Sequence, residues 1–463
     1  MTDKIIPTAA NTGVVAAAGK DLDDDKVVPR KQVISWALWD WATQPFNTVI
    51  LTFVFVALYL VSDDFIAPGQ DHDTALAHLS GQIAWAMALA GIGVAVVAPV
   101  LGQLADRTGR RKAWLGWTTL LLVVAMLSLY FVQASPSYFL LGVCILAVGS
   151  VIGEIAGVNY NAMLVQVSSP HTAGRVSGLG WGLGYIGGIV ALVLVVVSDS
   201  FDWFGLDTSN GMAYRLIAVG CAVWTLLFAW PLFRYVPEAP AAPRGTGGGI
   251  LNAYVLLWHS IRGLWHEARS TLWFLAASAV YRDGLAGVFV FGAVIAANAY
   301  DFDDTEVIMF GIAANLIAGV VTMISGRFDD RLGPRTVIIV ALCGIIVGGL
   351  AVAFLHDFGE IIFWIFGLLL AGMVGPAQAA SRSLLSRVSP QGRETEMFGL
   401  YATTGRAASF LSPIAWAVAV GITGLTLWGT LGIITIVAAG LVLLLFVRTP
   451  ADRGEAARPV LSE

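Results

Sequence analysis

The chain has 463 residues, of which 57% are hydrophobic and only 12% charged, and its mean hydropathy is +0.78. Soluble proteins carry about 25% charged residues. A chain with half that share has too little polar surface to coat a water-facing fold, which excludes an ordinary soluble globular protein. The net charge of -5 is mild, so the placement of the charges matters more than their sum.

The first 30 residues contain an acidic cluster, Asp21 with residues 23–25, and no long apolar run. This pattern is not that of a signal peptide, which needs a positively charged start and an apolar centre. We therefore expect residues 1–30 to form a disordered cytoplasmic tail, and residues 449–463 to form a second one.

Runs of about 20 mostly apolar residues, the length that crosses a bilayer, follow this tail. The sequence predicts an all-α membrane protein with twelve transmembrane helices in two pseudo-symmetric six-helix halves, residues 31–236 and 271–448. The expected spans are 35–61, 80–104, 113–133, 137–165, 175–199, 212–235, 271–298, 305–325, 336–355, 361–386, 394–421 and 425–447.

A break rich in Pro, Gly and Ala separates the halves and predicts a linker over residues 237–270. Within it, Leu251, Tyr254, Trp258, Ile261 and Trp265 recur at helical spacing. This pattern is typical of a helix that lies on the membrane surface. We expect the linker to be cytoplasmic and this helix to have a structural role.

Arginine and lysine gather in alternate loops, whereas the intervening loops are acidic. Because basic loops stay in the cytoplasm, both termini are expected there, in a multi-pass protein of the cytoplasmic membrane. The basic residues of these loops are Arg107, Arg110, Arg111, Lys112, Arg234, Arg244, Arg327, Arg331, Arg335, Arg387 and Arg393.

One loop pattern occurs twice, after the second and after the eighth span, which indicates an internal duplication. The first copy contains Gly102, Asp106, Arg107, Gly109 and Arg110, and the second contains Asp330, Arg331 and Gly333 after Gly326. Two six-helix halves are the architecture of transporters built from parallel repeats.

This doubled pattern resembles the cytoplasmic signature of the major facilitator superfamily, and the resemblance covers about residues 31–450. It implies that Asp106, Arg107, Arg110, Asp330 and Arg331, with their glycines, form a cytoplasmic gate between the halves. Positive charge that only orients the chain is the alternative, but such a signal needs no aspartate.

Further segments resemble the vacuole-effluxer-like (autophagy-related protein 22-like) branch of that superfamily. Fungal members of this branch are linked to amino-acid efflux. Residues 43–45 differ from the residues that are usual in this branch, and we expect these positions to face a substrate cavity between the halves. The segments that carry the resemblance are residues 36–42, 177–185, 281–284, 378–384 and 396–401.

Polar residues at membrane depth are costly and are therefore candidates for a functional site. Asp40, Gln44 and Asn47 share one face of the first span and predict a stripe that lines a cavity. Pro45 is expected to kink the helix beside it. The alternative is that Asp40 only caps or pairs near the inner surface.

Glu154 lies near the middle of the fourth span, with Asn161 two turns further on. A carboxyl group at that depth must either pair with an arginine or be protonated, and the second condition suits a proton-coupling site. We expect Glu154 to couple transport to protons, with a structural ion pair as the alternative.

In the second half, Arg282 and Asp283 are adjacent in the seventh span, and Arg382 lies in the tenth. We expect Asp283 and Arg382 to line the cavity with Asn161 and with Tyr185 of the fifth span. An acid from one half and an arginine from the other would suit a zwitterion such as an amino acid. The alternative is that these charged residues only form ion pairs that hold neighbouring helices together.

The sequence therefore predicts a secondary active transporter of a small solute, with an amino acid or similar molecule favoured and alternating access as the mechanism. A sugar or cation symporter and a drug exporter are alternatives of the same fold, and a membrane sensor is one of another class. No P-loop, metal-ligand spacing or nucleophile–base pair indicates an enzyme, cofactor or metal. The expected partners are the substrate and the lipid bilayer, without nucleic acid, and we expect a monomer.

Overall fold

The computed structural model describes residues 27–69, 72–169, 171–205, 210–238, 262, 265, 269–300, 302, 304–389 and 393–447. These residues contain no β-strand. Apart from residues 27–30, the expected tails lie outside the described part of the chain. The expected surface helix of the linker also lies almost wholly outside it.

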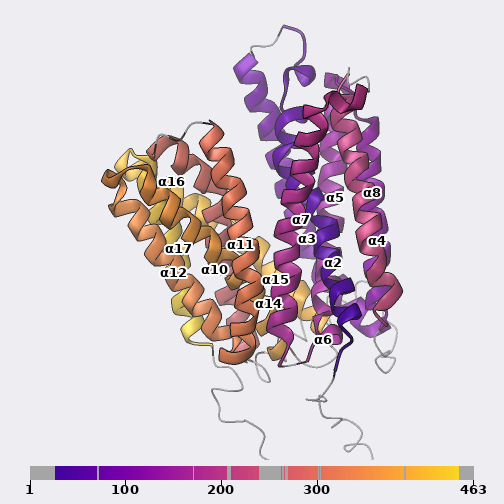
Figure 1. The fold of residues 1–463 in the computed structure, drawn as a ribbon, viewed down its shortest axis with the longest axis vertical. Helices are drawn as coiled ribbons and strands as arrows, with labels where there is room; N and C mark the ends of the chain where they lie inside the picture. Colours follow the sequence, from indigo (N-terminus) through magenta and orange to yellow (C-terminus); the bar gives the residue numbers. More distant parts are fainter. Residues whose placement is uncertain are drawn as a thin grey trace, which may run out of the picture.

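The first half is a bundle of long helices that lie side by side (Figure 1). Its elements are α2 (Arg30–Pro45), η1 (Phe46–Phe53), η2 (Phe55–Leu60), η3 (Asp63–Phe65), α3 (His72–Thr108), α4 (Arg111–Ser128), η4 (Leu129–Phe131), η5 (Pro136–Tyr138), α5 (Phe139–Ala162), α6 (Leu164–Val167), α7 (Ala173–Ser200), η6 (Asp202–Gly205) and α8 (Met212–Tyr235).

The second half repeats this plan. Its elements are α10 (Arg269–Ala299), α11 (Asp304–Leu332), α12 (Pro334–Phe354), η7 (His356–Phe358), α13 (Glu360–Ile362), η8 (Phe363–Gly367), α14 (Leu368–Val388), α15 (Glu394–Ala408), α16 (Leu411–Thr423), η9 (Thr426–Trp428) and α17 (Gly429–Leu445).

Eleven helical segments of the described chain are long and apolar enough to cross a membrane. The expected first span is also helical, but it changes character at Pro45, where α2 ends and the π-helices η1 and η2 continue. Proline removes a backbone donor, and wider π-type turns are one way to continue past the gap. With this first segment, the all-α architecture predicted from the sequence is confirmed.

The halves meet along two pairs of helices, α7 with α11 and α3 with α15. Figure 1 shows them close together at the end where α7 begins and α11 ends, and diverging toward the opposite end. We call the closed end, defined by Ala173 and Leu332, the latch end.

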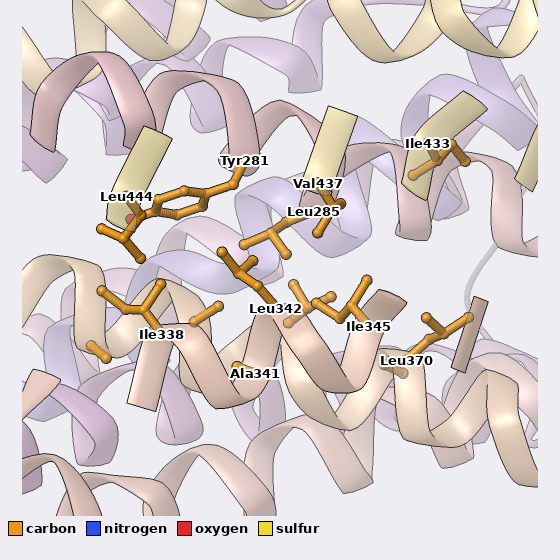
Figure 2. Packing of buried hydrophobic residues seen from close by; sticks show 14 of the residues in the cluster. Tyr281, Leu285, Ile338, Ala341, Leu342, Ile345, Leu370, Ile433, Val437 and Leu444 are labelled. Carbon is orange, nitrogen blue, oxygen red and sulfur yellow. The ribbon is translucent and has the colours of Figure 1, made fainter. Parts of the chain in front are cut away.

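Each half packs around apolar side chains. The cluster of the second half also takes in four residues of the first, Val94, Ala98, Val158 and Ala162. Figure 2 shows the cluster of the second half, where side chains of α10, α12 and α17 point toward one another. Tyr281 and Leu285 of α10 meet Ile338 and Leu342 of α12, and all four are fully buried. These cores make each half a packed unit, so relative movement is expected at the interface between them rather than inside either half.

Two expectations about helix ends are corrected. The doubled motif lies mostly in helices, because α3 runs to Thr108 and α11 to Leu332. The turns are short: Gly109 and Arg110 join α3 to α4, and Gly333 joins α11 to α12. The two glycines have φ of 63° and 86°, a region that favours glycine. The expected span 394–421 is also broken, since α15 ends at Ala408 and α16 begins at Leu411.

Candidate substrate cavity and latch

A cavity of about 410 Å³ lies between the two halves, with walls from α2, α5 and α7 on one side and α10, α14 and α15 on the other. It holds seven of the eight residues predicted to line the cavity or couple protons. These are Asp40, Gln44, Asn47, Glu154, Asn161, Tyr185 and Arg382.

Arg382 of α14 is the most heavily bonded side chain of the cavity. Its Nη1 donates to Asp40 Oδ2 at 3.2 Å and to Asn161 Oδ1 at 2.9 Å. Its Nε donates to the Ser177 hydroxyl at 2.9 Å and its Nη2 to the Ser177 carbonyl at 2.6 Å. The second half therefore reaches three helices of the first half through one guanidinium.

Aromatic rings enclose this ion pair. The Tyr160 ring is stacked between Trp36 and Trp39, with centroids 4.4 Å away on both sides, and its hydroxyl donates to Asp40 Oδ2 at 3.0 Å. The Arg382 guanidinium lies 5.0 Å from the Trp36 ring centroid. The two tryptophan rings fix the position of Tyr160, and its hydroxyl therefore helps to orient the Asp40 carboxylate.

Gly180 lets α7 approach this group of side chains. A Cβ there would lie 2.9 Å from Arg382 Nη2, Asp40 Oδ2 and the Tyr160 hydroxyl. Gly188, two turns further, faces Thr48 in the same way. Gly180 and Gly188 thus allow α7 to pack closely on α2, which is the usual role of small residues between membrane helices.

A second ion pair crosses between the halves, from Glu154 of α5 to Arg406 of α15. Both side chains are about two-fifths exposed, at 41% and 40%. The sequence required Glu154 either to pair with an arginine or to be protonated, and in the structure it pairs with Arg406. Its exposure to the cavity also leaves the carboxylate accessible to water and solutes.

Asp283 is not among the residues that line the cavity. It lies between α10 and α16, and its carboxylate accepts a 2.5 Å hydrogen bond from the backbone N–H of Ser412, at the start of α16. The break between α15 and α16 frees this N–H, and a carboxylate is a favourable cap for a helix N-terminus. Pro413, inside the expected span 394–421, is the sequence signal that could have indicated the break, because proline is favoured in the first turn of a helix and disrupts a helix interior.

At the latch end, Asp330 of α11 caps the start of α7 from the other half. Its carboxylate accepts hydrogen bonds from the backbone N–H of Gly174 at 2.8 Å and of Arg175 at 3.1 Å, and it pairs with the Arg175 side chain at 2.8 Å. Arg387 of α14 approaches the same carboxylate at 3.4 Å. Charge and helix dipole thus act together across the interface.

Beside the first copy of the motif, a different contact joins the halves: Arg111 of α4 pairs with Glu394 of α15 at 2.5 Å. Gly102 lies close to this point, and a Cβ on it would lie 2.6 Å from the Thr395 carbonyl oxygen. Gly102 is therefore a packing position between the halves.

The remaining residues of the predicted gate have different surroundings. Arg110 and Arg331 are exposed, and within the described chain neither forms an ion pair with the other half. The side chains of Asp106 and Arg107 lie outside the described residues. Among the predicted acids and arginines, Asp330 is the one whose contacts between the halves are described.

Sequence reasoning omitted several residues of the cavity. Tyr160, which lines the cavity, and Ser177, which is buried and accepts hydrogen bonds from Arg382, were missed because a hydroxyl in an apolar helix gives a weak signal. Arg282 and Arg406 also line the cavity. Both lie within expected spans, but their orientation could not be read from the helix period. Gln378 also lines it.

Comparison with known proteins agrees with this architecture. The family model described as "Vacuole effluxer Atg22 like" matches residues 28–457. The chain belongs to the Atg22-like vacuole effluxer family. It is 24% identical over 422 residues to YxiO of Bacillus subtilis, an uncharacterized MFS-type transporter, covering 90% of this chain and 95% of that protein.

The fungal relatives match a smaller part of this Atg22-like chain. Autophagy-related protein 22 of Cryptococcus neoformans (strain B-3501A) is 24% identical over 312 residues, which are 62% of this chain and 54% of the fungal protein. The chain thus spans about half the length of that relative.

Solved structures show the same fold. The proton:xylose symporter XylE superposes with a TM-score of 0.69 at 15% identity, over 91% of this chain and 96% of that one. FucP in its outward conformation gives a TM-score of 0.67 at 13% identity, over 91% and 99%. The family match and the relationship to YxiO, with this shared fold, identify the protein as a membrane transporter of the major facilitator superfamily, in its Atg22-like branch.

Proposed function

We propose that the protein is a secondary active transporter that moves a small polar solute, with an amino acid favoured, by alternating access at the cavity between the halves. The observation that carries this proposal is the cavity itself. Polar and charged groups of both halves converge there, and close contacts between the halves lie on one side of it at the latch end.

The latch end is proposed to face the cytoplasm. Most of the short loops and helix ends that carry arginine and lysine lie there, including Arg110, Arg111 and Arg335, and basic loops remain on the cytoplasmic side. On this orientation both chain ends are cytoplasmic, the protein lies in the cytoplasmic membrane, and the cavity faces the outside. Reporter fusions at the two termini would test it, since an external signal from either terminus contradicts it.

The transport experiment uses the full chain in proteoliposomes. Uptake of radiolabelled amino acids, sugars and cationic dyes is compared with uptake into empty liposomes. Saturable uptake of one class, abolished by loss of Arg382, supports the transporter proposal and ranks the substrates. Saturable binding without any flux supports a sensor on a transporter fold instead.

We further propose that Glu154 couples transport to protons. Its carboxylate lies at the cavity and pairs with Arg406 across the interface. Protonation would cancel the charge that holds this pair, so proton binding would loosen one contact between the halves.

Glu154→Gln is the test of coupling, because glutamine has the shape of a permanently protonated glutamate. We expect the variant to exchange solute at a rate independent of pH, while the natural protein responds to a pH gradient. Asn161→Asp, which adds a titratable group elsewhere in the cavity, is a control for general electrostatic effects. A pH response that survives in Glu154→Gln removes the assignment.

A further inference from the structure

One arginine of the cavity has no acidic partner among the described residues. The Arg282 guanidinium, on α10, lies 3.7 Å from the centroid of the Tyr401 ring. Its Nη1 donates a 3.0 Å hydrogen bond to the Tyr401 backbone carbonyl. A guanidinium carries five N–H donors, so most of the donor capacity of Arg282 is unused by these two contacts.

The neighbouring residue explains why Arg282 faces the cavity. Tyr281 is fully buried and points into the core of the second half, as Figure 2 shows. Its hydroxyl is 2.6 Å from the Ser381 hydroxyl. Successive residues of a helix point about 100° apart, so fixing Tyr281 in the core turns Arg282 out of it, toward the interface with the first half.

A glycine makes room for the guanidinium. A Cβ on Gly405 of α15 would lie 3.0 Å from Arg282 Nη1 and 3.4 Å from Cζ. The Tyr401 ring and this helix surface together hold the planar group in a defined place. Arg282 is therefore held at the cavity wall by its surroundings.

The charges of the cavity do not balance. Its lining contains three arginines, at positions 282, 382 and 406, and two acids, Asp40 and Glu154. Arg382 pairs with Asp40, and Arg406 pairs with Glu154. Asp283, next to Arg282 in sequence, is occupied by the backbone of Ser412. The uncompensated charge of the lining is thus positive and belongs to Arg282.

We propose that Arg282 binds a carboxylate of the transported solute, so that the substrate class is small organic acids, including amino acids. The inference rests on the proposed transport function and deepens it. The fork of N–H donors matches a carboxylate in two parallel hydrogen bonds. An arriving carboxylate also compensates a charge that is costly at membrane depth, whereas a neutral sugar or a cation does not.

Ligands that differ only in their carboxylate or amino group can show which of these groups the protein recognises. Purified full-length protein is titrated with three sets: amino acids, the same carbon skeletons without the amino group, and the corresponding amino-acid amides. Alanine, propionate and alaninamide are the simplest such trio, and larger side chains extend each set. Thermal stability reports binding, since a ligand at about 100 times its Kd adds a readily measured stabilisation.

We expect stabilisation by amino acids or by the simple acids, and none by the amides. Binding of both acid sets identifies the carboxylate as sufficient, and binding of amino acids alone adds a requirement for the ammonium. Stabilisation by the amides, or by sugars or cationic dyes while every carboxylate fails, overturns the inference. This comparison needs no variant, so it does not depend on how substitutions fold.

Variants then locate the contact. Arg282→Gln should weaken binding of the active carboxylate about tenfold to a hundredfold, the effect of losing hydrogen bonds to a charged group. Arg282→Lys, which keeps the charge but loses the fork, should fall between. Gly405→Ala should also weaken binding, because its Cβ crowds the guanidinium.

Arg269→Gln is the matched control. Arg269 starts the same helix, lies over the Trp265 ring and donates to a backbone carbonyl, but it is exposed and does not line the cavity. Equal loss of affinity in Arg269→Gln and Arg282→Gln contradicts the assignment. Flux of a non-carboxylate solute in proteoliposomes would reject this inference and leave the transporter proposal intact, whereas absence of all flux would reject the latter.

Discussion

The two halves share one helical plan but bring opposite charges to the cavity. The first half supplies the acids, Asp40 and Glu154, and the second supplies all three arginines. Each ion pair of the cavity therefore crosses the interface instead of stabilising one half. Duplication explains the helical plan that the two halves share. Divergence between the two copies explains why the cavity walls carry opposite charges, acidic on the first half and basic on the second.

The two crossing pairs differ in their access to water. Arg382 is 3% exposed and Asp40 is 23% exposed, whereas Arg406 and Glu154 are both about two-fifths exposed. A buried charge that loses its partner stays uncompensated, but an exposed one is solvated. The buried pair is thus suited to hold the halves in register, and the exposed pair to respond to protons or solute.

Arg382→Gln should produce the largest effect. It removes the charge that compensates Asp40 and the donor to Ser177, and breaking a buried pair costs about 3–5 kcal/mol of unfolding free energy. We expect a large fall in Tm of the detergent-purified protein and loss of transport.

Asp40→Asn in the same background separates charge from packing. If the cost comes from an uncompensated carboxylate, the double variant should recover part of the lost stability. A double variant that is less stable than Arg382→Gln by the full cost of Asp40→Asn alone would show that the two residues are not coupled.

Gly180→Ala should have a smaller effect on the same pair from a third helix. The added methyl must displace the ends of Arg382, Asp40 or Tyr160, and overpacking costs about 1–3 kcal/mol. Gly220→Ala on α8 is the control, because nothing lies within 4 Å of its Cβ position. That change should be neutral or should stabilise the helix by up to about 1 kcal/mol. Equal Tm values for both variants would contradict the close packing of α7 on the pair.

Much of this arrangement could be predicted from the sequence. Hydropathy gave the helices, and helical spacing placed Asp40, Gln44 and Asn47 on one face of the first span, where the structure has all three at the cavity. These features depend on local patterns, because a polar stripe on an apolar membrane helix must face other protein groups or a water-filled cavity.

The rest depends on contacts between distant segments. Nothing near Glu154 in sequence indicates that its partner is Arg406, 252 residues later. Arg282 and Asp283 could not be ranked, because the outcome depends on Tyr281 entering the core and on Ser412 beginning a helix. Tertiary packing decides which of these side chains faces the cavity, and helical periodicity alone cannot predict it.

Arg406→Gln should have the smallest effect on stability, although it removes the same chemical group as Arg382→Gln. Exposed ion pairs contribute about 0–1 kcal/mol, and the Glu154 carboxylate left behind can be solvated in the cavity. We therefore expect a Tm close to that of the natural protein, with the pH response of transport altered because Glu154 has lost its partner. Comparing the two glutamine variants under identical conditions tests the distinction between the pairs directly. If Arg406→Gln instead loses as much stability as Arg382→Gln, this outcome would mean that both pairs hold the halves together. Proton binding at Glu154 would then destabilise the whole interface instead of acting as a local switch.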